Sequence, residues 1–290
     1  MKDKEEKKIE KDNGIVYRIG IIGTGRIAAR FLTEARDVKA AEVTIVYNPK
    51  RESAQKFGQQ WHVQSTDSLM LFFQLSDIVY VASPHETHYR YIRKALQKDK
   101  HVISEKPMVL KKAEAEELCR LAERNLVLLE GIKTLYCPGY QMVRKLVAEG
   151  TIGTLCNVEA CFTKLEKRHT RELNDTLYGG SFTELGSYGL LPVLQLLGNN
   201  PSEIRIDSLF SEKGIDLFTR VSFIYESALA NITCGLGVKS EGRLLLSGTE
   251  GYILVAAPWW KTQHIEVHYE DASVVDVYEE HYVGDGLRYE

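Results

Sequence analysis

The chain has 290 residues, of which 44% are hydrophobic and 27% are charged, and its formal net charge is −3. This composition is typical of a globular protein with a sizeable core, and the length fits one large domain or two of moderate size. The weak charge gives no indication of a nucleic-acid or membrane-surface partner. No apolar run approaches the ~18 residues that a membrane-spanning helix needs.

Two features bear on the cellular setting. Residues 1–14 are mostly charged and lack the apolar segment of a signal peptide, so we predict a solvated tail there. The five cysteines form no Cys-x-x-Cys pair and no Cys/His ligand spacing. This scattered set predicts a reducing, cytoplasmic location, and we expect no metal site.

The first part of the chain alternates short apolar runs with amphipathic stretches. We predict strands over residues 17–23, 42–47, 77–82, 101–104 and 126–129. Helices are predicted between them, over residues 26–36, 51–57, 88–97 and 111–125. Such alternation indicates βαβ units with right-handed crossovers. Residues 15–135 are therefore predicted to form a doubly wound parallel sheet with helices on both faces.

The pattern changes after residue 135. A predicted helix over residues 138–149 is followed by strand-like segments separated mostly by short turns, with one more helix near residues 186–197. The segments cover residues 155–163, 203–209, 216–225, 228–234, 243–247, 252–256 and 264–269. Residues 136–290 are predicted to form a second, α+β domain with a large, mostly antiparallel sheet. The fold class is therefore α/β with two domains.

The segment Gly23-Thr24-Gly25-Arg26-Ile27-Ala28 follows the first strand and opens the first helix. Its pattern, G-x-G-x-x-A, combines a tight turn, a close approach of a pyrophosphate to the backbone, and close packing of helix on strand. The positive end of the helix would then face the phosphates. We predict that Gly23, Thr24, Gly25, Arg26 and Ile27 bind a dinucleotide; a plain glycine turn is the alternative.

The second strand ends at Asn48, where an acidic residue commonly binds the adenosine ribose. Asn can still form a hydrogen bond with a ribose hydroxyl, and it brings no charge that would repel a 2′-phosphate. The nearby Lys50 and Arg51 are able to pair with that phosphate, or are simply solvated at a helix start. The cofactor is therefore NAD or NADP, with a slight preference for NADP.

Polar residues also follow the third and fourth strands, where ligands of open α/β sheets bind. They are Ser83, Pro84, His85 and His88 after the third strand, and Glu105, Lys106 and Pro107 after the fourth. A turn at the protein surface is the alternative explanation for either group. Because several neighbouring strands end in residues suited to a ligand, we favour a binding site.

These motifs together resemble the glucose–fructose oxidoreductase / inositol dehydrogenase (Gfo/Idh/MocA) family. The resemblance rests on GTGRIA at 23–28, SPHETH at 83–88, EKP at 105–107 and GGSFTELGSYGLLPVLQLLG at 179–198. It covers nearly the whole chain, from about residue 15, with the motifs in the family's order. It implies an N-terminal Rossmann domain and a C-terminal α/β domain with a large antiparallel sheet, which agrees with the pattern of predicted elements.

The resemblance also implies roles for individual residues. Lys106 would lie between the nicotinamide ribose and the substrate hydroxyl, Glu105 would orient its segment, and Pro107 would shape the turn. Ser83, Pro84 and His88 would line the cofactor near the nicotinamide. Glu184 and Tyr188 stand where many relatives have Asp and a His base.

A tyrosine hydroxyl ordinarily has a pKa of about 10, so a role of Tyr188 as base requires help. We expect the Lys106 ammonium to favour the phenolate, which would make the two residues an acid–base pair. The alternative is a core aromatic residue on a helix face. Lys133 and the basic run Arg168, His169 and Arg171 are interpreted as solvated side chains.

The sequence thus predicts an NAD(P)-dependent oxidoreductase for a sugar, polyol or related alcohol. We expect a homo-oligomer, a dimer or tetramer, formed through the C-terminal sheet. The sequence stops at Glu290, where relatives continue into further helices, so we expect apolar surface to be uncovered there. A non-catalytic NAD(P)-binding sensor is the first alternative. A methyltransferase using S-adenosylmethionine is the second, and it would not bind reduced nicotinamide.

Overall fold

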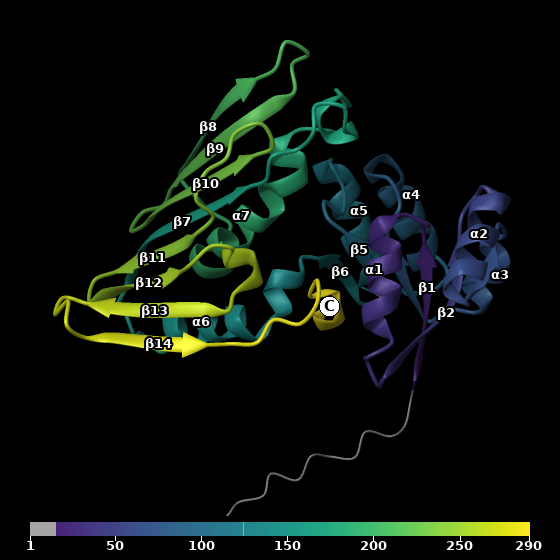
Figure 1. Ribbon diagram of the computed structural model, residues 1–290, viewed down its shortest axis with the longest axis horizontal. Coiled ribbons are helices and arrows are strands. Elements are labelled where there is room, and N and C mark those ends of the chain that lie inside the picture. Colours follow the sequence, from purple (N-terminus) through teal and green to yellow (C-terminus); the bar gives the residue numbers. More distant parts are fainter. Residues whose placement is uncertain (1–15, 124) are drawn as a thin grey trace, which may run out of the picture.

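The computed structural model describes residues 16–123 and 125–290, so the tail predicted for residues 1–14 lies outside the described part. The chain forms two sheets, each with its own helices (Figure 1). Within the described residues, none of the helices has both the length and the apolar character needed to cross a membrane.

The N-terminal sheet has six parallel strands in the order β3-β2-β1-β4-β5-β6. This is the strand order of a Rossmann fold, and it confirms the predicted doubly wound sheet. The strands are β1 (Tyr17–Ile22), β2 (Ala41–Tyr47), β3 (Gln64–Thr66), β4 (Ile78–Val81), β5 (His101–Glu105) and β6 (Leu128–Gly131). The helices are α1 (Arg26–Ala35), α2 (Arg51–Trp61), α3 (Leu69–Gln74), α4 (His85–Leu96) and α5 (Lys112–Ala122).

Three details of this domain differ from the prediction. The short elements β3 and α3 were not predicted, because three and six residues carry little periodicity. Helix α4 begins at His85, three residues earlier than expected, since Pro84 serves as its N-cap and its carbonyl accepts the N–H of Thr87. His85 therefore belongs to the first turn of a helix rather than to a loop.

The C-terminal sheet has eight strands in the order β14-β13-β12-β11-β7-β10-β9-β8. All neighbours are antiparallel except β7 and β10, which confirms a mostly antiparallel sheet. The strands are β7 (Leu155–Thr163), β8 (Glu203–Phe210), β9 (Asp216–Ile224), β10 (Leu229–Gly235), β11 (Leu244–Gly248), β12 (Gly251–Val255), β13 (His264–Tyr269) and β14 (Val275–Glu279). Strand β14 was not predicted.

Helices α6 (Pro138–Ala148) and α7 (Ser181–Leu197) cover one face of this sheet, and α7 lies between the sheet and the N-terminal domain in Figure 1. Successive side chains of a strand point to opposite faces. Val158 and Ile232 are buried under the helices, whereas Glu159 and Asn231 line the opposite face. One face of the sheet is thus apolar and covered, and the other is polar.

Helix α7 begins at Ser181, five residues before the predicted start at Gly186. Gly186 lies inside the helix, where a Cβ would come within 2.9 Å of the Phe182 ring. Gly189 is equally close to Ile232 of β10. Gly186 makes room for the Phe182 ring of the same helix, and Gly189 lets α7 approach β10. The longer helix carries Glu184 in its first turn.

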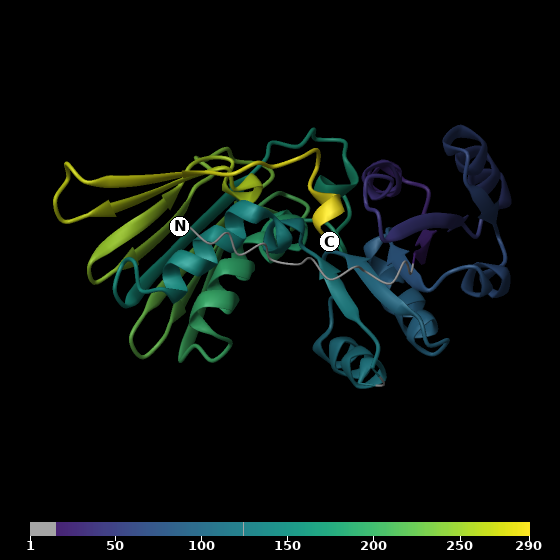
Figure 2. The same cartoon turned by 90° about the horizontal axis from the view of Figure 1, so that it is seen from below.

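The C-terminal segment returns to the N-terminal domain. The 3₁₀ turn η4 (Leu287–Tyr289) packs against α1 between the two domains (Figure 2). The carboxylate of Glu34 on α1 accepts the backbone N–H groups of Asp285 and Arg288. The Arg288 guanidinium also lies 2.8 Å from the Asp37 carboxylate. The chain therefore joins the two domains a second time, near its end.

Candidate active site

The glycine loop lies where β1 ends, beside the end of β4. Gly23 has a φ of +119°, and a Cβ there would come 2.4 Å from the carbonyl oxygen of Ala82. Gly25 is the N-cap of α1 and has open space around its Cβ position. Among the described residues, no side chain caps the first turn of α1, so its N–H groups remain available. A close backbone approach beside a helix N-terminus is what a pyrophosphate needs, so these residues fit a dinucleotide.

The end of β2 is tied to this loop. The Asn48 amide donates a hydrogen bond of 2.7 Å to the Thr24 hydroxyl, and its oxygen accepts the N–H of Lys50 at 2.9 Å. Asn48 therefore fixes the glycine loop from the end of β2. Lys50 and Arg51 are exposed at the start of α2, where their charges face solvent.

His88 has a different position from the one expected. It is fully buried, with Nδ1 2.9 Å from the carbonyl oxygen of Pro107 and Nε2 2.8 Å from that of Ser83. Burial lowers the pKa of His88, so the ring is neutral near pH 7. Instead of lining the cofactor, His88 packs between the ends of β4 and β5, and as a neutral ring it donates to one of the two carbonyl groups. Ser83 and Pro84 remain at the edge.

Buried contacts also hold the Glu105-Lys106-Pro107 segment from the side of the sheet. The Glu105 carboxylate accepts the hydroxyl of Tyr80, and burial raises the pKa of Glu105. Glu130 accepts the N–H of Met108 at 2.8 Å. These contacts fix the backbone on both sides of Lys106, whose side chain extends toward the C-terminal domain. The polar residues at the end of β5 therefore form a positioned segment rather than a free turn.

Lys106 meets the first turn of α7. Its Nζ donates a hydrogen bond of 2.7 Å to the backbone carbonyl of Glu184 and lies 3.6 Å from Oε2 of the same residue. The other carboxylate oxygen, Oε1, is 2.8 Å from Arg171 and 3.9 Å from Nδ1 of His85. Two cations and one imidazole thus surround the Glu184 carboxylate at the domain junction.

His85 contributes a neutral imidazole to this cluster. Burial, together with the charge of Lys106, lowers the pKa of His85 to about 3. Among the described residues its Nδ1 is buried and has no hydrogen-bond partner. A neutral ring with a free nitrogen is able to bind a ligand hydroxyl.

Tyr188 lies on α7 one turn after Glu184. Its side chain is buried, and its ring contacts Phe162 edge to face, with the ring centroids 5.0 Å apart. Burial raises the pKa of Tyr188, and the carboxylates of Glu105 and Glu290 raise it further. The expectation that Lys106 favours the phenolate is therefore wrong for this structure. Tyr188 carries its proton near neutral pH.

Two residues interpreted as solvated have other positions. Arg171, in the 3₁₀ turn η2 (Arg171–Leu173), reaches Glu184. Lys133, in η1 (Lys133–Tyr136), is half-buried; burial lowers its pKa, opposed by the charges of Asp285, Glu290 and Glu105. The only sequence signal for Arg171 was the basic run before α7, which is also typical of a solvated loop.

Two protein-family models match the chain. The model described as an oxidoreductase family with an NAD-binding Rossmann fold matches residues 17–130. The model of the GFO/IDH/MocA C-terminal domain matches residues 140–254. The chain belongs to the Gfo/Idh/MocA family of oxidoreductases. It is therefore an enzyme of the nicotinamide-dependent oxidoreductase class, as predicted, and the methyltransferase alternative is not supported.

Curated relatives and solved structures of this family align over most of the chain. The scyllo-inositol 2-dehydrogenase (NADP(+)) IolU of Bacillus subtilis (strain 168) is 26% identical, over 90% of this chain and 82% of the relative. The trans-1,2-dihydrobenzene-1,2-diol dehydrogenase of Danio rerio is 27% identical, over 85% and 76%. The 3-ketoreductase KijD10 of Actinomadura kijaniata, solved with NADP and TDP-benzene, is 22% identical with a TM-score of 0.78, over 94% and 87% of the two chains.

Proposed function

We propose that this protein transfers a hydride between a nicotinamide cofactor and the hydroxyl or carbonyl carbon of a sugar, polyol or related alcohol. The observation that carries the proposal is the meeting of Lys106 with Glu184 at the edge where the glycine loop lies. The names of the relatives support the substrate class, because they specify an inositol dehydrogenase, a dehydrogenase of a cyclic diol and a ketoreductase.

In this proposal Lys106 orients the substrate oxygen. Its Nζ is held at the Glu184 carbonyl, so a substrate oxygen placed beside it accepts a second N–H without displacing the lysine. Bound nicotinamide accepts or supplies the hydride. Tyr188 exchanges a proton with the substrate oxygen, and Arg171 keeps the Glu184 carboxylate from drawing Lys106 away. Since Tyr188 is protonated near neutral pH, it is then in the form that donates a proton during carbonyl reduction.

We further propose NADP as the preferred cofactor. Asn48 brings no negative charge to the ribose position, and Lys50 and Arg51 are exposed beside it. A 2′-phosphate placed at the end of β2 would meet these two cations. The NADP named for IolU and KijD10 supports the same choice.

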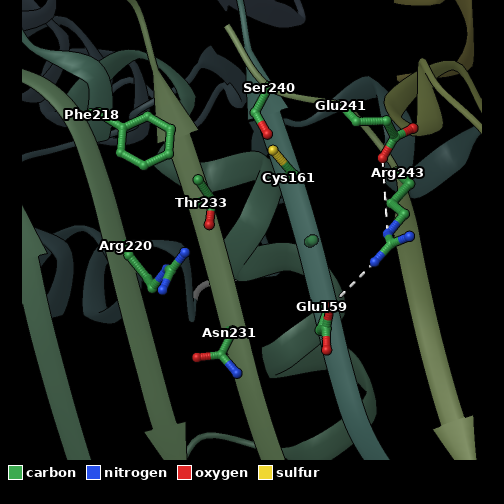
Figure 3. Close-up of a pocket in the computed structure, with 10 residues that line it drawn as sticks. Glu159, Cys161, Phe218, Arg220, Asn231, Thr233, Ser240, Glu241 and Arg243 are labelled. Carbon is green, nitrogen blue, oxygen red and sulfur yellow. Dashed lines mark ion pairs between the residues drawn. The ribbon is translucent and has the colours of Figure 1, made fainter. Parts of the chain in front are cut away.

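The polar face of the C-terminal sheet supports a homo-oligomer. This face has a hollow of about 580 Å³. In Figure 3, Arg220 of β9 extends toward Thr233 of β10, and Arg243 pairs with Glu159 and Glu241. Such a face carries both charge signs and so suits a second copy of itself. Light scattering after size exclusion gives the oligomer size. A cytoplasmic location is proposed from the five cysteines, all of which are free thiols.

The first test is a fluorescence titration with NADH and NADPH, on the wild type and on Lys106→Ala, followed by turnover on a panel of sugars and polyols. We expect tight binding of NADPH by both proteins and turnover by the wild type alone. Failure of both cofactors to bind refutes the proposal. Cofactor binding without turnover, in either direction and across the panel, favours the non-catalytic sensor.

A further inference from the structure

A second cavity lies beside Tyr188, on the covered side of the C-terminal sheet. Phe162, at the end of β7, contacts the Tyr188 ring with its edge and stacks on Trp260, with ring centroids 3.5 Å apart and planes 7° apart. Phe162 and Trp260 both line this cavity of about 620 Å³. An aromatic wall therefore begins directly next to the proposed proton donor.

The other residues of the cavity are mostly apolar or already paired. Leu165, Ala257 and Pro258 add apolar surface. The side chains of Thr163, Lys164 and Lys239 each have a partner within the protein. The Thr163 hydroxyl bonds to Ser240, Lys239 donates to the Thr163 carbonyl at 3.1 Å, and Lys164 pairs with Glu166.

Trp260 is held in a defined position. Its carbonyl accepts the Thr134 hydroxyl at 2.7 Å, and one ring face lies on Phe162. On the benzo edge of the indole, a Cβ at Gly242 would come within 2.8 Å of the ring. The chain has glycine at the point where a side chain would push the indole away. A ring fixed in this way offers a preformed surface, which a ligand uses at low entropic cost.

We propose that this cavity binds the ring of the substrate next to the reacting carbon, and that it selects a cyclic alcohol with an apolar or unsaturated ring over a fully hydroxylated one. The inference rests on the proposed function and narrows its substrate class. An apolar ring stacks on the aromatic wall, whereas each additional hydroxyl enters a cavity in which the side chains of Thr163, Lys164 and Lys239 are already paired. An apolar pocket discriminates by about 100-fold in kcat/KM against an analogue that carries one additional hydroxyl.

The test compares two six-membered rings, trans-1,2-cyclohexanediol and myo-inositol, by calorimetry on the NADPH-saturated protein. Neither alcohol is oxidised in that complex, so binding is measured apart from turnover. We expect the diol to bind at least ten times more tightly than myo-inositol. Trp260→Ala is expected to weaken diol binding about tenfold while the Kd for NADPH is unchanged, and Trp260→Phe is expected to restore most of the affinity.

Gly242→Ala is an independent variant, since it displaces the Trp260 indole without removing it. It is expected to weaken binding of the diol to the same extent as Trp260→Ala. Equal or tighter binding of myo-inositol by the wild type overturns the inference. Unchanged diol binding in both Trp260→Ala and Gly242→Ala overturns it as well. The proposed function fails separately, through absence of NADPH binding or of turnover on any alcohol, because those measurements do not involve Trp260.

Discussion

Replacement of Gly23 by Ala tests the proposed cofactor site at the position where the backbone at the end of β4 approaches most closely to a glycine Cβ position. An added Cβ would lie 2.4 Å from the carbonyl oxygen of Ala82, whereas non-bonded heavy atoms prefer about 3.5 Å. The ends of β1 and β4 would have to separate by about 1 Å. Two hydrogen bonds of 2.9 Å hold this region, from Ala82 to the Ile22 carbonyl and from Gly23 to the Tyr47 carbonyl.

The magnitude follows from these contacts. A φ of +119° in a residue with a side chain costs roughly 1–3 kcal/mol, and weakening two backbone hydrogen bonds costs about 1 kcal/mol each. Gly23→Ala is therefore expected to lower the free energy of unfolding by about 3–5 kcal/mol. NADPH affinity is expected to fall at least tenfold, because the displaced backbone is the surface that the pyrophosphate approaches.

Gly214→Ala is the matched control, since Gly214 also has a positive φ, +76°, but no atom of the described residues lies within 4 Å of its Cβ position. The Gly214→Ala variant should lose only the part of the unfolding free energy that comes from the backbone conformation, about 1–2 kcal/mol. Its affinity for NADPH should be unchanged. Denaturant unfolding and fluorescence titration measure both quantities. The reasoning is refuted if Gly23→Ala is no less stable than Gly214→Ala and binds NADPH as tightly as the wild type.

Three further predictions concern the site chemistry. The kcat of carbonyl reduction should be independent of pH between about 5 and 8, because the pKa of Tyr188 is raised and that of His85 is about 3. The kcat of alcohol oxidation should rise with pH. A change in the kcat of reduction near pH 6.5 contradicts this prediction. Arg171→Gln should lower kcat about 3–10-fold without changing the Kd for NADPH, because the Glu184 carboxylate is then free to hold Lys106. A changed Kd would instead indicate that Arg171 contacts the cofactor. Lys50→Glu should raise the Kd for NADPH about tenfold and leave that for NADH unchanged, and equal effects on both refute the 2′-phosphate contact.

Much of the fold, and the geometry of the candidate cofactor site, was predictable because the signals are local. The G-x-G-x-x-A pattern occupies six residues between a strand and a helix, and its geometry follows from the glycines themselves. Strand ends in a parallel sheet meet at one edge whatever the details of packing. Lys106 was therefore identified from its position after β5, and the structure brings it to Glu184, 78 residues away.

The remaining features depend on contacts between distant parts of the chain. Arg171 was misjudged because only the folded loop before α7 brings it to Glu184. The pKa of Tyr188 was assigned in the wrong direction because burial and the carboxylate of Glu290 are invisible in its local sequence. His88 matched a cofactor motif, yet its position is decided by the two carbonyl groups between which it packs. In each case tertiary surroundings override a local pattern.

The return of the chain to α1 constrains any movement of the two domains relative to each other. With Asp285 and Arg288 bound to Glu34, the two domains share two hinges rather than one, the first between β6 and α6 and the second just before η4. A double hinge permits rotation about the line that joins its two points and resists twisting about any other axis. Rotation about that line leaves the Glu34 contacts intact, whereas a twist about another axis would have to break them.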